Sequence, residues 1–590
     1  MAETADVVVI GGGPAGSSAA GFLAKHNRRV ILLEREKFPR HHIGESTLQG
    51  LFGMLDEELG VGEQLKKAGF RVKTGGSFVW GNDKTPWSFH FTDRADAERI
   101  DRVGFEVERE VFDQVLLDHC RSLGVGVREE ATVDSLIVVD DRVQGVTYRD
   151  VSGAHRSIEA HYVIDASGLS SIVGRQLGID RKYDQVRNFA IYGYWDSEVL
   201  PYTELGGDIT EADLSNILIV HSTGCWIWFI PLHGRISIGV VAEINQRSEV
   251  TRLGVRDFYL SKISDCPEAA QLLRQSTLMG EEPLRTAQDW SHICERLCGP
   301  GYFLAGDAAA FVDPILASGV HLAVTFGLNC GRSVNTLLTY PEARVPWAYS
   351  WYHAAYAMSY EDFRQMADAW YLGSGRSEDW FEVARQRVQE TLNEELSRTE
   401  AFARLASGTL TSGSFRDRVC HVDASRVPPR VYFSPVTNRY AYTVDARETM
   451  ARFLEDFPTS MIPPVFAESP LATANFPLAN VHIATESVLS LTPEVRIGFF
   501  SERGHPVLEA AAYLAKPNQV IDIGMYAPLH PVLVEVLESL DGRHSVLEVA
   551  EWFSIEPSNL VHYLKTLANA GFIQAGEQSS HVEPTQRIRD

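Results

Sequence analysis

The sequence predicts an α/β protein with a Rossmann-type first domain, and three observations lead to this fold class. A β-branched run at 6–10 leads directly into glycines, an alanine-rich helix at 17–25 and a second apolar run at 29–33. Short apolar runs of this kind are typical of buried parallel strands. A further strand ends in a Gly-Asp turn at 302–307, and residues 185–245 alternate aromatic and β-branched side chains. Because such alternation suits a sheet, we expect a second sheet interleaved with the first domain.

The first turn has the spacing of a dinucleotide-binding loop. Gly11, Gly13 and Gly16 follow the first strand in G-x-G-x-x-G order. The first glycine of such a loop permits the tight turn, the second lets the backbone approach a pyrophosphate, and the third lets helix and strand pack closely. Glu34 and Arg35 follow the second strand about 20 residues on, where a carboxylate accepts the ribose hydroxyls. The order of strand, glycines, helix, strand and acid therefore predicts a dinucleotide site.

Three further segments favour FAD over NAD. The strand that ends at Gly306-Asp307, with Pro314 shortly after, resembles the second FAD-binding motif of the para-hydroxybenzoate-hydroxylase-like flavoproteins. Residues around Asp165 and Arg109 resemble two more motifs of that superfamily, in the same order along the chain. The resemblance implies that Asp307 holds the ribityl chain, that Arg109 lies near the flavin phosphates and that the turn at Asp165 closes the site.

A short aromatic motif narrows the class further. Residues 226–231 read Trp-Ile-Trp-Phe-Ile-Pro, which resembles the W-x-W-x-I-P motif of flavin-dependent halogenases. In that family the two tryptophans, here Trp226 and Trp228, pack beside the flavin and keep the organic substrate away from it, which disfavours hydroxylation. Without the FAD motifs, the same residues would suit an ordinary core strand.

Lys73 matches the lysine that halogenases carry ahead of a glycine and aromatic strand. A hypochlorous oxidant needs a group that directs its chlorine to the substrate. A lysine ammonium can hydrogen-bond the oxidant, whereas a neutral amine can trap it as a chloramine. Burial lowers the pKa of a lysine, so a desolvated lysine suits either role, and the sequence leaves both open.

Two more segments match the halogenase family. Gly44, Glu45 and Ser46 resemble the G-E-S segment that lies near the isoalloxazine ring, and Ser318 and Gly319 align with the backbone pair that cradles chloride. Amides at a helix N-terminus suit a halide because they offer N–H donors and a favourable dipole.

One position departs from the tryptophan halogenases. Those enzymes carry a catalytic glutamate two residues past the proline, where this chain has Leu316. The chain therefore resembles the class of the chloramphenicol-pathway halogenase and of halogenases with phenolic or carrier-bound substrates. Asp289 precedes an aromatic residue and a serine as in chloramphenicol-type relatives, and this resemblance makes it a candidate for a covalent ester with the flavin.

Composition excludes several other classes of protein. The net charge of −24 opposes binding to nucleic acid or to an anionic membrane. Seven scattered cysteines form neither a disulfide framework nor a zinc-binding spacing, so we expect no metal site. We see no signal segment and no apolar run of about 18 residues, and expect a cytoplasmic protein without membrane spans.

We divide the chain into five parts. A FAD-binding, monooxygenase-like core is expected at 1–345 and an aromatic-rich helical segment packed on it at 346–400. The region 401–524 has no defined fold class, 525–575 is predicted to be a winged-helix-like domain, and 576–590 a disordered polar tail.

The C-terminal half offers two features with open interpretations. Residues 401–440 hold six Arg against two Asp, which suits either a solvated loop or docking of an anionic carrier protein. Three amphipathic helices are expected at 531–540, 545–553 and 556–570. Because residues 528–575 carry six acids against two bases, docking or dimerisation is favoured there over DNA binding.

Together these features predict an FADH2-dependent halogenase of secondary-metabolite, including antibiotic, biosynthesis. We expect a separate flavin reductase to supply the reduced FAD, because the sequence has one dinucleotide fingerprint. Chloride is the expected halide, and the expected substrate is a small phenolic or acyl group, free or bound to a carrier protein. The alternatives are an NADPH-dependent flavin hydroxylase and a flavin-binding regulator.

Overall fold

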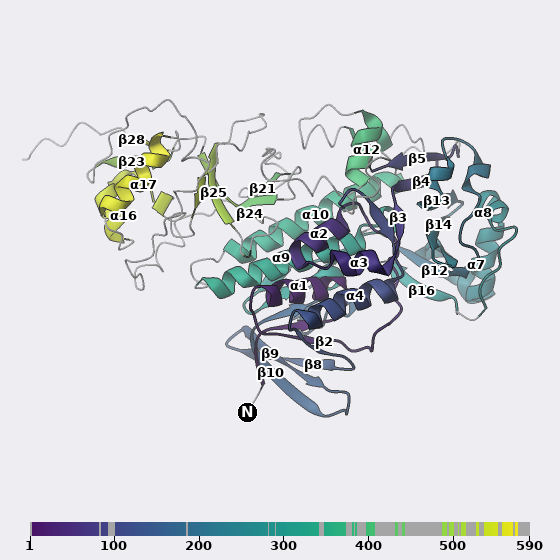
Figure 1. Cartoon of the computed structure of the whole chain (residues 1–590), viewed down its shortest axis with the longest axis horizontal. Helices are drawn as coiled ribbons and strands as arrows, with labels where there is room; N and C mark the ends of the chain where they lie inside the picture. The colour runs from purple at the N-terminus through teal and green to yellow at the C-terminus, as the bar shows by residue number, and fades with distance from the viewer. Residues whose placement is uncertain are drawn as a thin grey trace, which may run out of the picture.

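The structure is a computed structural model of the chain (Figure 1). It describes residues 3–81, 84–91, 101–184, 187–280, 283–289, 291–340 and 347–372, and shorter stretches between 380 and 575.

The first sheet confirms the predicted Rossmann-type arrangement. Its main path has the order β18-β19-β10-β1-β2-β7, with β9 paired to β10 and β8 paired to β9. Strands β19, β10, β1, β2 and β7 are mutually parallel, and Ile10 pairs with both Asp165 and Leu33. The carboxyl ends of three strands therefore meet where the glycine loop begins. The strands are β1 (Glu3–Ile10), β2 (Val30–Leu33), β7 (Gly126–Arg128), β8 (Thr132–Val139), β9 (Arg142–Arg149), β10 (His155–Asp165), β18 (Cys298–Gly299) and β19 (Tyr302–Leu304).

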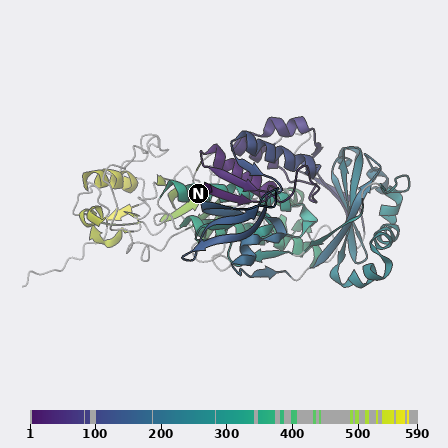
Figure 2. The ribbon, with the colours of Figure 1, turned by 90° about the horizontal axis from the view of Figure 1, so that it is seen from below.

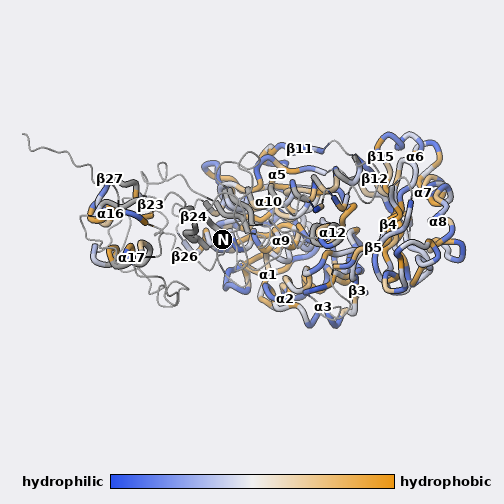
Figure 3. Tube along the Cα trace, turned by 90° about the horizontal axis from the view of Figure 1, so that it is seen from above, coloured by the Kyte–Doolittle hydropathy of each residue, from blue (hydrophilic) through white to orange (hydrophobic). Residues whose placement is uncertain are grey.

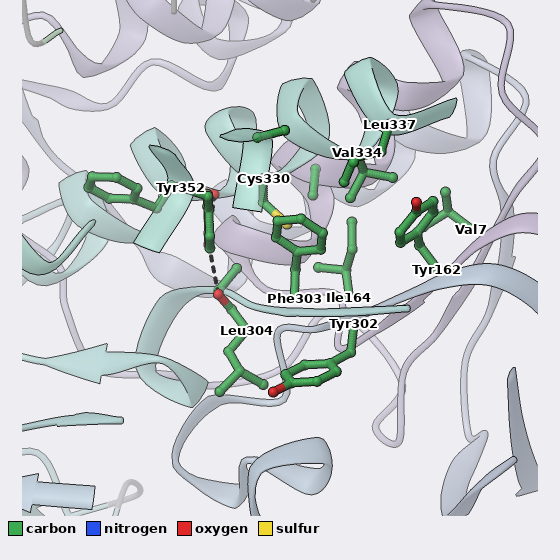
Figure 4. Close-up of a cluster of buried hydrophobic side chains, with 14 of the residues drawn as sticks. Val7, Tyr162, Ile164, Tyr302, Phe303, Leu304, Cys330, Val334, Leu337 and Tyr352 are labelled. Carbon is green, nitrogen blue, oxygen red and sulfur yellow. Dashed lines mark hydrogen bonds between the residues drawn. The ribbon is translucent and has the colours of Figure 1, made fainter. Parts of the chain in front are cut away.

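Long helices cover this sheet. α1 (Pro14–Lys25) packs against α9 (Gly319–Thr339), and α10 (Trp347–Leu372) packs against α9 in turn. Figure 4 shows side chains of α9 and α10 meeting Ile164 of β10 and Phe303 of β19 in one buried cluster, where the Tyr352 hydroxyl donates a 2.7 Å hydrogen bond to the Leu304 carbonyl. This contact ties α10 to the strand that leads into the Gly306 turn.

The second sheet has seven strands in the order β16-β12-β15-β14-β13-β4-β5. It lies at one end of the molecule, with α7 and α8 on its outer side (Figure 2). The tube in Figure 3 shows apolar stretches along these strands. The predicted strands at 188–195 and 235–242 are confirmed as β12 and β15. The elements are β4 (Gly75–Val79), β5 (Trp87–His90), β12 (Asn188–Trp195), β13 (Ile217–Ser222), β14 (Cys225–Leu232), β15 (Arg235–Glu243), β16 (Arg285–Asp289), α6 (Arg247–Leu253), α7 (Val255–Ser264) and α8 (Pro267–Leu272).

Shorter elements connect the two sheets. β3 and β6 form a separate two-stranded sheet, and β11, β17 and β20 form a three-stranded one. These elements are α2 (Leu51–Leu59), α3 (Gly62–Ala68), β3 (Arg71–Lys73), β6 (Gly104–Glu106), α4 (Arg109–Ser122), η2 (Gly168–Ser170), α5 (Ile172–Gln176), β11 (Arg181–Tyr183), η3 (Tyr202–Leu205), η4 (Glu211–Asp213), η5 (Ile244–Gln246), β17 (His292–Cys294), η6 (Gly306–Ala308), β20 (Ala310–Phe311) and η7 (Pro314–Leu316).

The elements from Val488 onward lie at the opposite end from the seven-stranded sheet, whereas α12 (Arg398–Ala406) contacts β5 of that sheet (Figures 1 and 2). The helices predicted at 545–553 and 556–570 are present as α16 and α17, whereas most of 531–540 and of the basic stretch 401–440 lies outside the described residues. A strand from far upstream, β23, pairs between β27 and β28 and was not predicted. The winged-helix assignment and the domain limits stay predictions. The elements are α12 (Arg398–Ala406), β21 (Val431–Ser434), β22 (Arg439–Tyr442), β23 (Val488–Leu491), β24 (Val495–Phe500), β25 (Glu509–Leu514), β26 (Ala527–Leu529), β27 (Asp541–Ser545), α16 (Val546–Trp552), α17 (Pro557–Asn569) and β28 (Ile573–Ala575).

Among the described residues, no helix is both long enough and apolar enough to cross a membrane.

Candidate active site

The glycine loop has the geometry that its spacing predicts. Gly11 has a φ of 101°, in the left-handed region, and a Cβ on Gly16 would lie only 1.9 Å from the Gly11 carbonyl oxygen. A Cβ on Gly13 would meet only an Arg40 nitrogen at 3.4 Å, so this backbone is open toward a ligand. The Glu34 carboxylate accepts a 2.6 Å hydrogen bond from the Gly12 amide, which places it beside the loop. These residues fit an adenine dinucleotide.

The side chains of Arg35 and Asp165 make their hydrogen bonds to residues outside the glycine loop. The Arg35 side chain is 62% exposed and donates to the Ser170 hydroxyl at 3.3 Å. Asp165 is fully buried and accepts hydrogen bonds from the Ser167 and Val173 amides at 3.1 and 2.7 Å. Burial raises the pKa of Asp165 although these hydrogen bonds oppose it. Asp165 therefore shapes the turn beside the glycine loop, and the sequence indicated the turn but not this internal role.

Arg109 and Asp307 are both buried and lie near enough for their charges to interact. Arg109, at the start of α4, makes two hydrogen bonds of 2.8 and 2.9 Å to Asp113, one turn along the helix. Arg40 adds a 3.2 Å ion pair to the same carboxylate. Burial opposes the charge of Arg109, but the Asp113 carboxylate raises its pKa. Burial also raises the pKa of Asp307 to about 6, and the Arg109 charge limits that rise.

The Asp307 turn continues into η7. Gly306 has a φ of 60°, and its carbonyl accepts a 3.0 Å hydrogen bond from the Tyr356 hydroxyl. Pro314 begins η7, whose first turn is capped by the Asp313 carboxylate through a 3.0 Å hydrogen bond from the Ile315 amide. The loop that leads to α9 is thus held at both ends.

Lys73 lies at the end of β3 and is 2% exposed. Its ammonium donates hydrogen bonds to the Ser46 hydroxyl at 2.8 Å and to the Thr47 carbonyl at 3.0 Å, and lies 5.6 Å from the centre of the Phe91 ring. Burial lowers the pKa of Lys73, while the nearby Glu106 carboxylate raises it. Sequence reasoning missed Glu106, because only the pairing of β3 with β6 brings it near Lys73.

Trp226 and Trp228 point to the same face of β14, with ring centres 6.0 Å apart. A Cβ on Gly239, the partner of Trp228 on β15, would lie 2.1 Å from the Trp228 ring. Glycine therefore leaves the space that this indole occupies. Trp228 also donates a 3.2 Å hydrogen bond to the Ser237 hydroxyl.

Trp226 belongs to a network that the sequence did not indicate. Its indole N–H donates to the Tyr371 hydroxyl of α10 at 2.9 Å, and that hydroxyl donates to the Asp313 carboxylate at 2.9 Å. The Asn188 amide also donates to Asp313, at 3.2 Å. Asp289 pairs with Asn188 through the backbone of β16, which brings that strand end near Asp313; its side chain lies outside the described residues.

The aromatic-rich segment divides between two cores. Trp351 and Tyr356 pack in the core of the first sheet, whereas Trp370 and Trp380 stack at 4.7 Å in the cluster that contains both signature tryptophans. Leu316, the position that departs from the tryptophan halogenases, is buried in that second cluster.

Ser318 and Gly319 begin α9. Ser318 is fully buried, and among the described residues its hydroxyl has no hydrogen-bond partner. It does not cap the helix, and the preceding Ala317 has a φ of 56°. A buried hydroxyl at the start of a 21-residue helix is the setting in which an anion would be stabilised.

The segment 40–47 brings the separate parts together. Its Gly44 lies against both Arg109 and the first turn of α9, since a Cβ there would be 2.8 Å from an Arg109 nitrogen and 3.4 Å from a Val320 methyl carbon. Glu45 accepts a 2.7 Å hydrogen bond from the Tyr194 hydroxyl of the second sheet. Burial raises the pKa of Glu45 to about 7.

A histidine extends the contacts of this segment to the second sheet. His41 hydrogen-bonds the Tyr192 hydroxyl at 3.0 Å, and the Tyr192 ring lies 5.9 Å from that of Trp228. Burial lowers the pKa of His41 to about 4. With Ser46 bound to Lys73, the segment touches the predicted lysine, tryptophan, halide and phosphate regions.

Comparison with known proteins identifies the class of this molecule. Residues 4–339, more than half of the chain, match the family described as the FAD binding domain. The chain is 31% identical to a tryptophan 2-halogenase of Chondromyces crocatus over 70% of this chain and 77% of the relative. It is 32% identical to a 1H-pyrrole-2-carbonyl-(peptidyl-carrier protein) chlorinase of Pseudomonas fluorescens, over 54% of this chain and 73% of the relative.

Solved structures agree with this. The myxobacterial chondrochloren halogenase CndH is 31% identical, with a TM-score of 0.58 over 69% of this chain and 97% of CndH. The flavin-dependent halogenase CmlS, at 24% identity, shares the fold over 100% of this chain and 99% of its own, with a TM-score of 0.61. The chain belongs to the flavin-dependent halogenase family and is an enzyme of this class.

Proposed function

We propose that this enzyme uses reduced FAD, oxygen and chloride to chlorinate a small electron-rich phenolic or acyl group, free or bound to a carrier protein, in secondary-metabolite biosynthesis. The observation that carries the proposal is the placement of segment 40–47, which contacts Lys73, the start of α9 and the Tyr192–Trp228 pair. A separate reductase and a cytoplasmic location remain part of the proposal.

FAD fits the residues present. Gly11, Gly13 and Gly16 would hold the pyrophosphate, Glu34 the adenosine ribose and Asp307 the ribityl chain. When bound, reduced FAD with oxygen and chloride would supply a hypochlorous oxidant. The covalent link to Asp289 is proposed on sequence resemblance alone.

The protein's own residues would then control where the oxidant goes. Trp226 and Trp228 would separate the organic substrate from the flavin, and their indole N–H groups are held by the Tyr371 and Ser237 hydroxyls. Lys73 would receive the oxidant and direct its chlorine to the substrate. Ser318 and the first amides of α9 would hold chloride.

The substrate class rests on Leu316. A carboxylate at this position is what the resemblance implies for tryptophan halogenases, and leucine offers no charge to support attack on a less activated ring. The pyrrolyl-carrier chlorinase supports a carrier-bound substrate, whereas the relative named tryptophan 2-halogenase makes free tryptophan the second candidate.

The test supplies the enzyme with FAD, a flavin reductase, NADH, oxygen and chloride, together with phenols, carrier-bound acyl groups and free tryptophan. Mass spectrometry should show a chlorine isotope pattern that Lys73→Ala abolishes. Lys182→Ala, which changes a lysine whose side chain is 69% exposed, should leave chlorination intact. Gain of one oxygen without dependence on chloride would establish the hydroxylase instead.

Ser318→Ala tests the halide site. Because the wild-type hydroxyl is buried without a partner in the described residues, its removal should leave the melting temperature unchanged or slightly higher. The chloride concentration needed for half-maximal chlorination should rise several-fold. An unchanged chloride requirement would remove Ser318 from the halide site.

A further inference from the structure

A buried carboxylate shares the face on which Lys73 lies. Glu106 is fully buried at the end of β6, and within the described residues neither of its carboxylate oxygens accepts a close, well-directed hydrogen bond. Burying a carboxylate without full hydrogen bonding is unfavourable, so its presence calls for a compensating charge.

Strand register sets the direction of the three side chains. Lys73 pairs with Gly104 and Arg71 with Glu106 in the antiparallel β3–β6 pair. On the other edge of β6, Ser46 forms an antiparallel bridge with Glu106. Directly paired residues, and residues two apart on one strand, point to the same face of a sheet. Lys73, Glu106 and Ser46 therefore converge on one face.

Gly104 keeps the path between them open. A Cβ at this position would lie 3.4 Å from Cδ of Lys73 and 2.7 Å from the Thr47 carbonyl oxygen. The stem of Lys73 crosses β6 over this glycine, and its ammonium reaches Ser46 at 2.8 Å. A larger residue at 104 would occupy the route that the lysine takes.

We propose that Glu106 is a positioning residue that, together with Ser46, keeps Lys73 in its ammonium form and directed across Gly104. Lys73 then acts by donating a hydrogen bond to the oxidant and does not form an N–Cl bond. This assignment rests on the proposed chlorination and decides between the two roles that the sequence leaves open for the lysine.

The charges around the pair agree with this assignment. Burial raises the pKa of Glu106 to about 7, and the charge of Lys73 and the hydroxyl of Ser46 act against that rise. The Glu45 carboxylate, which accepts from the Tyr194 hydroxyl, lies near enough that its charge also raises the pKa of Glu106. The ammonium of Lys73 therefore balances one of two carboxylate charges in this cluster, which contains both Glu45 and Glu106.

Two further groups surround Glu106. Tyr202 is fully buried, and its pKa is raised by burial and by the Glu106 charge, so its hydroxyl stays neutral. Arg71 pairs opposite Glu106, but its Nε donates to the Leu232 carbonyl at 3.0 Å. Lys73 is therefore the cation whose charge acts most directly on Glu106.

A stability cycle tests the pair without any catalysis. Melting temperatures of the full-length chain are compared for Glu106→Gln, Lys73→Met and the double variant at pH 7. Each single change should lower the melting temperature by several degrees, because it leaves one charge buried alone. The double variant should melt above both single variants, and purely additive losses would overturn the proposal.

A pH profile tests the role in the reaction. In Glu106→Gln the pKa of Lys73 should fall further, so the basic limb of the kcat profile should move at least one pH unit lower, with KM for the organic substrate little changed. Glu108→Gln, two residues along the chain and paired with surface His233, should leave the profile in place. An unmoved basic limb in Glu106→Gln would overturn the assignment. Absence of chlorination by the wild type would instead refute the proposed function, and the stability cycle would then decide whether Glu106 and Lys73 interact.

Discussion

Tyr371→Phe removes one oxygen atom from the link between α10, Trp226 and the loop before α9. In the wild type that hydroxyl accepts from the Trp226 indole at 2.9 Å and donates to Asp313 at 2.9 Å. Without it, the indole N–H remains buried among apolar rings with its acceptor removed. An unsatisfied buried donor costs about 1–3 kcal/mol, and a hydrogen bond to a charged group contributes about 1.5–3 kcal/mol.

The expected loss is therefore about 2–4 kcal/mol, because the Asn188 amide still donates to Asp313 at 3.2 Å and offsets part of the effect. Urea denaturation followed by circular dichroism, with FAD-free protein, measures the loss as a shift in midpoint at constant slope. The Trp226→Phe variant removes the other partner, and the pair should show a coupling of about 1 kcal/mol in a double-mutant cycle.

Tyr360→Phe is the matched control. Tyr360 lies on the same helix and donates a 2.7 Å hydrogen bond to Asp184, but within the described part of the chain it has no hydrogen bond to an indole. The Tyr360→Phe variant should lose stability because its hydrogen bond to the Asp184 carboxylate is removed, and it should show no coupling to Trp226→Phe. A loss below about 0.5 kcal/mol in Tyr371→Phe, or equal coupling in both tyrosine variants, would refute the network as an energetic unit.

Two other substitutions give opposite expectations for stability. Asp307→Asn should stabilise FAD-free protein by up to about 3 kcal/mol above pH 6. Burial raises the pKa of this carboxyl from 3.8 to about 6, so its ionisation in the folded protein becomes unfavourable as the pH rises through that window. Urea midpoints of wild type and variant at pH 4 and pH 8 measure this effect, and an equal difference at both pH values would contradict it. Gly104→Ala should destabilise by about 1–3 kcal/mol and reduce chlorination, because its Cβ would lie 2.7 Å from a carbonyl oxygen. Thermal melts measure the effect beside Gly280→Ala, whose Cβ would meet nothing within 4 Å and should be neutral.

The sequence predicted those parts of the site that are local in the chain. The glycine loop and Glu34 follow from one strand-helix-strand unit, whose geometry is fixed over a few residues. Lys73 and Trp228 could be proposed as site residues because each lies within a short recognisable segment. In each of these cases the position of the residue relative to a predicted strand was enough to propose it as part of the site.

The parts that were missed depend on pairing between distant segments. Glu106 reads as one acid among several at the start of a helix, and only the β3–β6 register brings it to Lys73. Tyr371 is one of many aromatic residues in α10, and nothing in its own segment distinguishes it from Trp351. Asp313 likewise gains its role from partners about 58 and 125 residues away. A sequence shows which side chains are polar and where strands end, but it does not show which distant residue a given side chain will contact.

The position of segment 40–47 has a consequence for how the two halves of the site act together. The segment has little regular structure of its own, so its order depends on what it touches. On one side Arg109 donates to the Ile43 carbonyl, and on the other Ser46 and Thr47 receive the Lys73 ammonium. Because few residues separate these contacts, a shift of Arg109 toward an anionic cofactor would be transmitted to the lysine by the backbone itself. If Lys73 acts as proposed, cofactor binding and the placement of its ammonium would be coupled through the backbone of this segment, with no long chain of packed side chains between them.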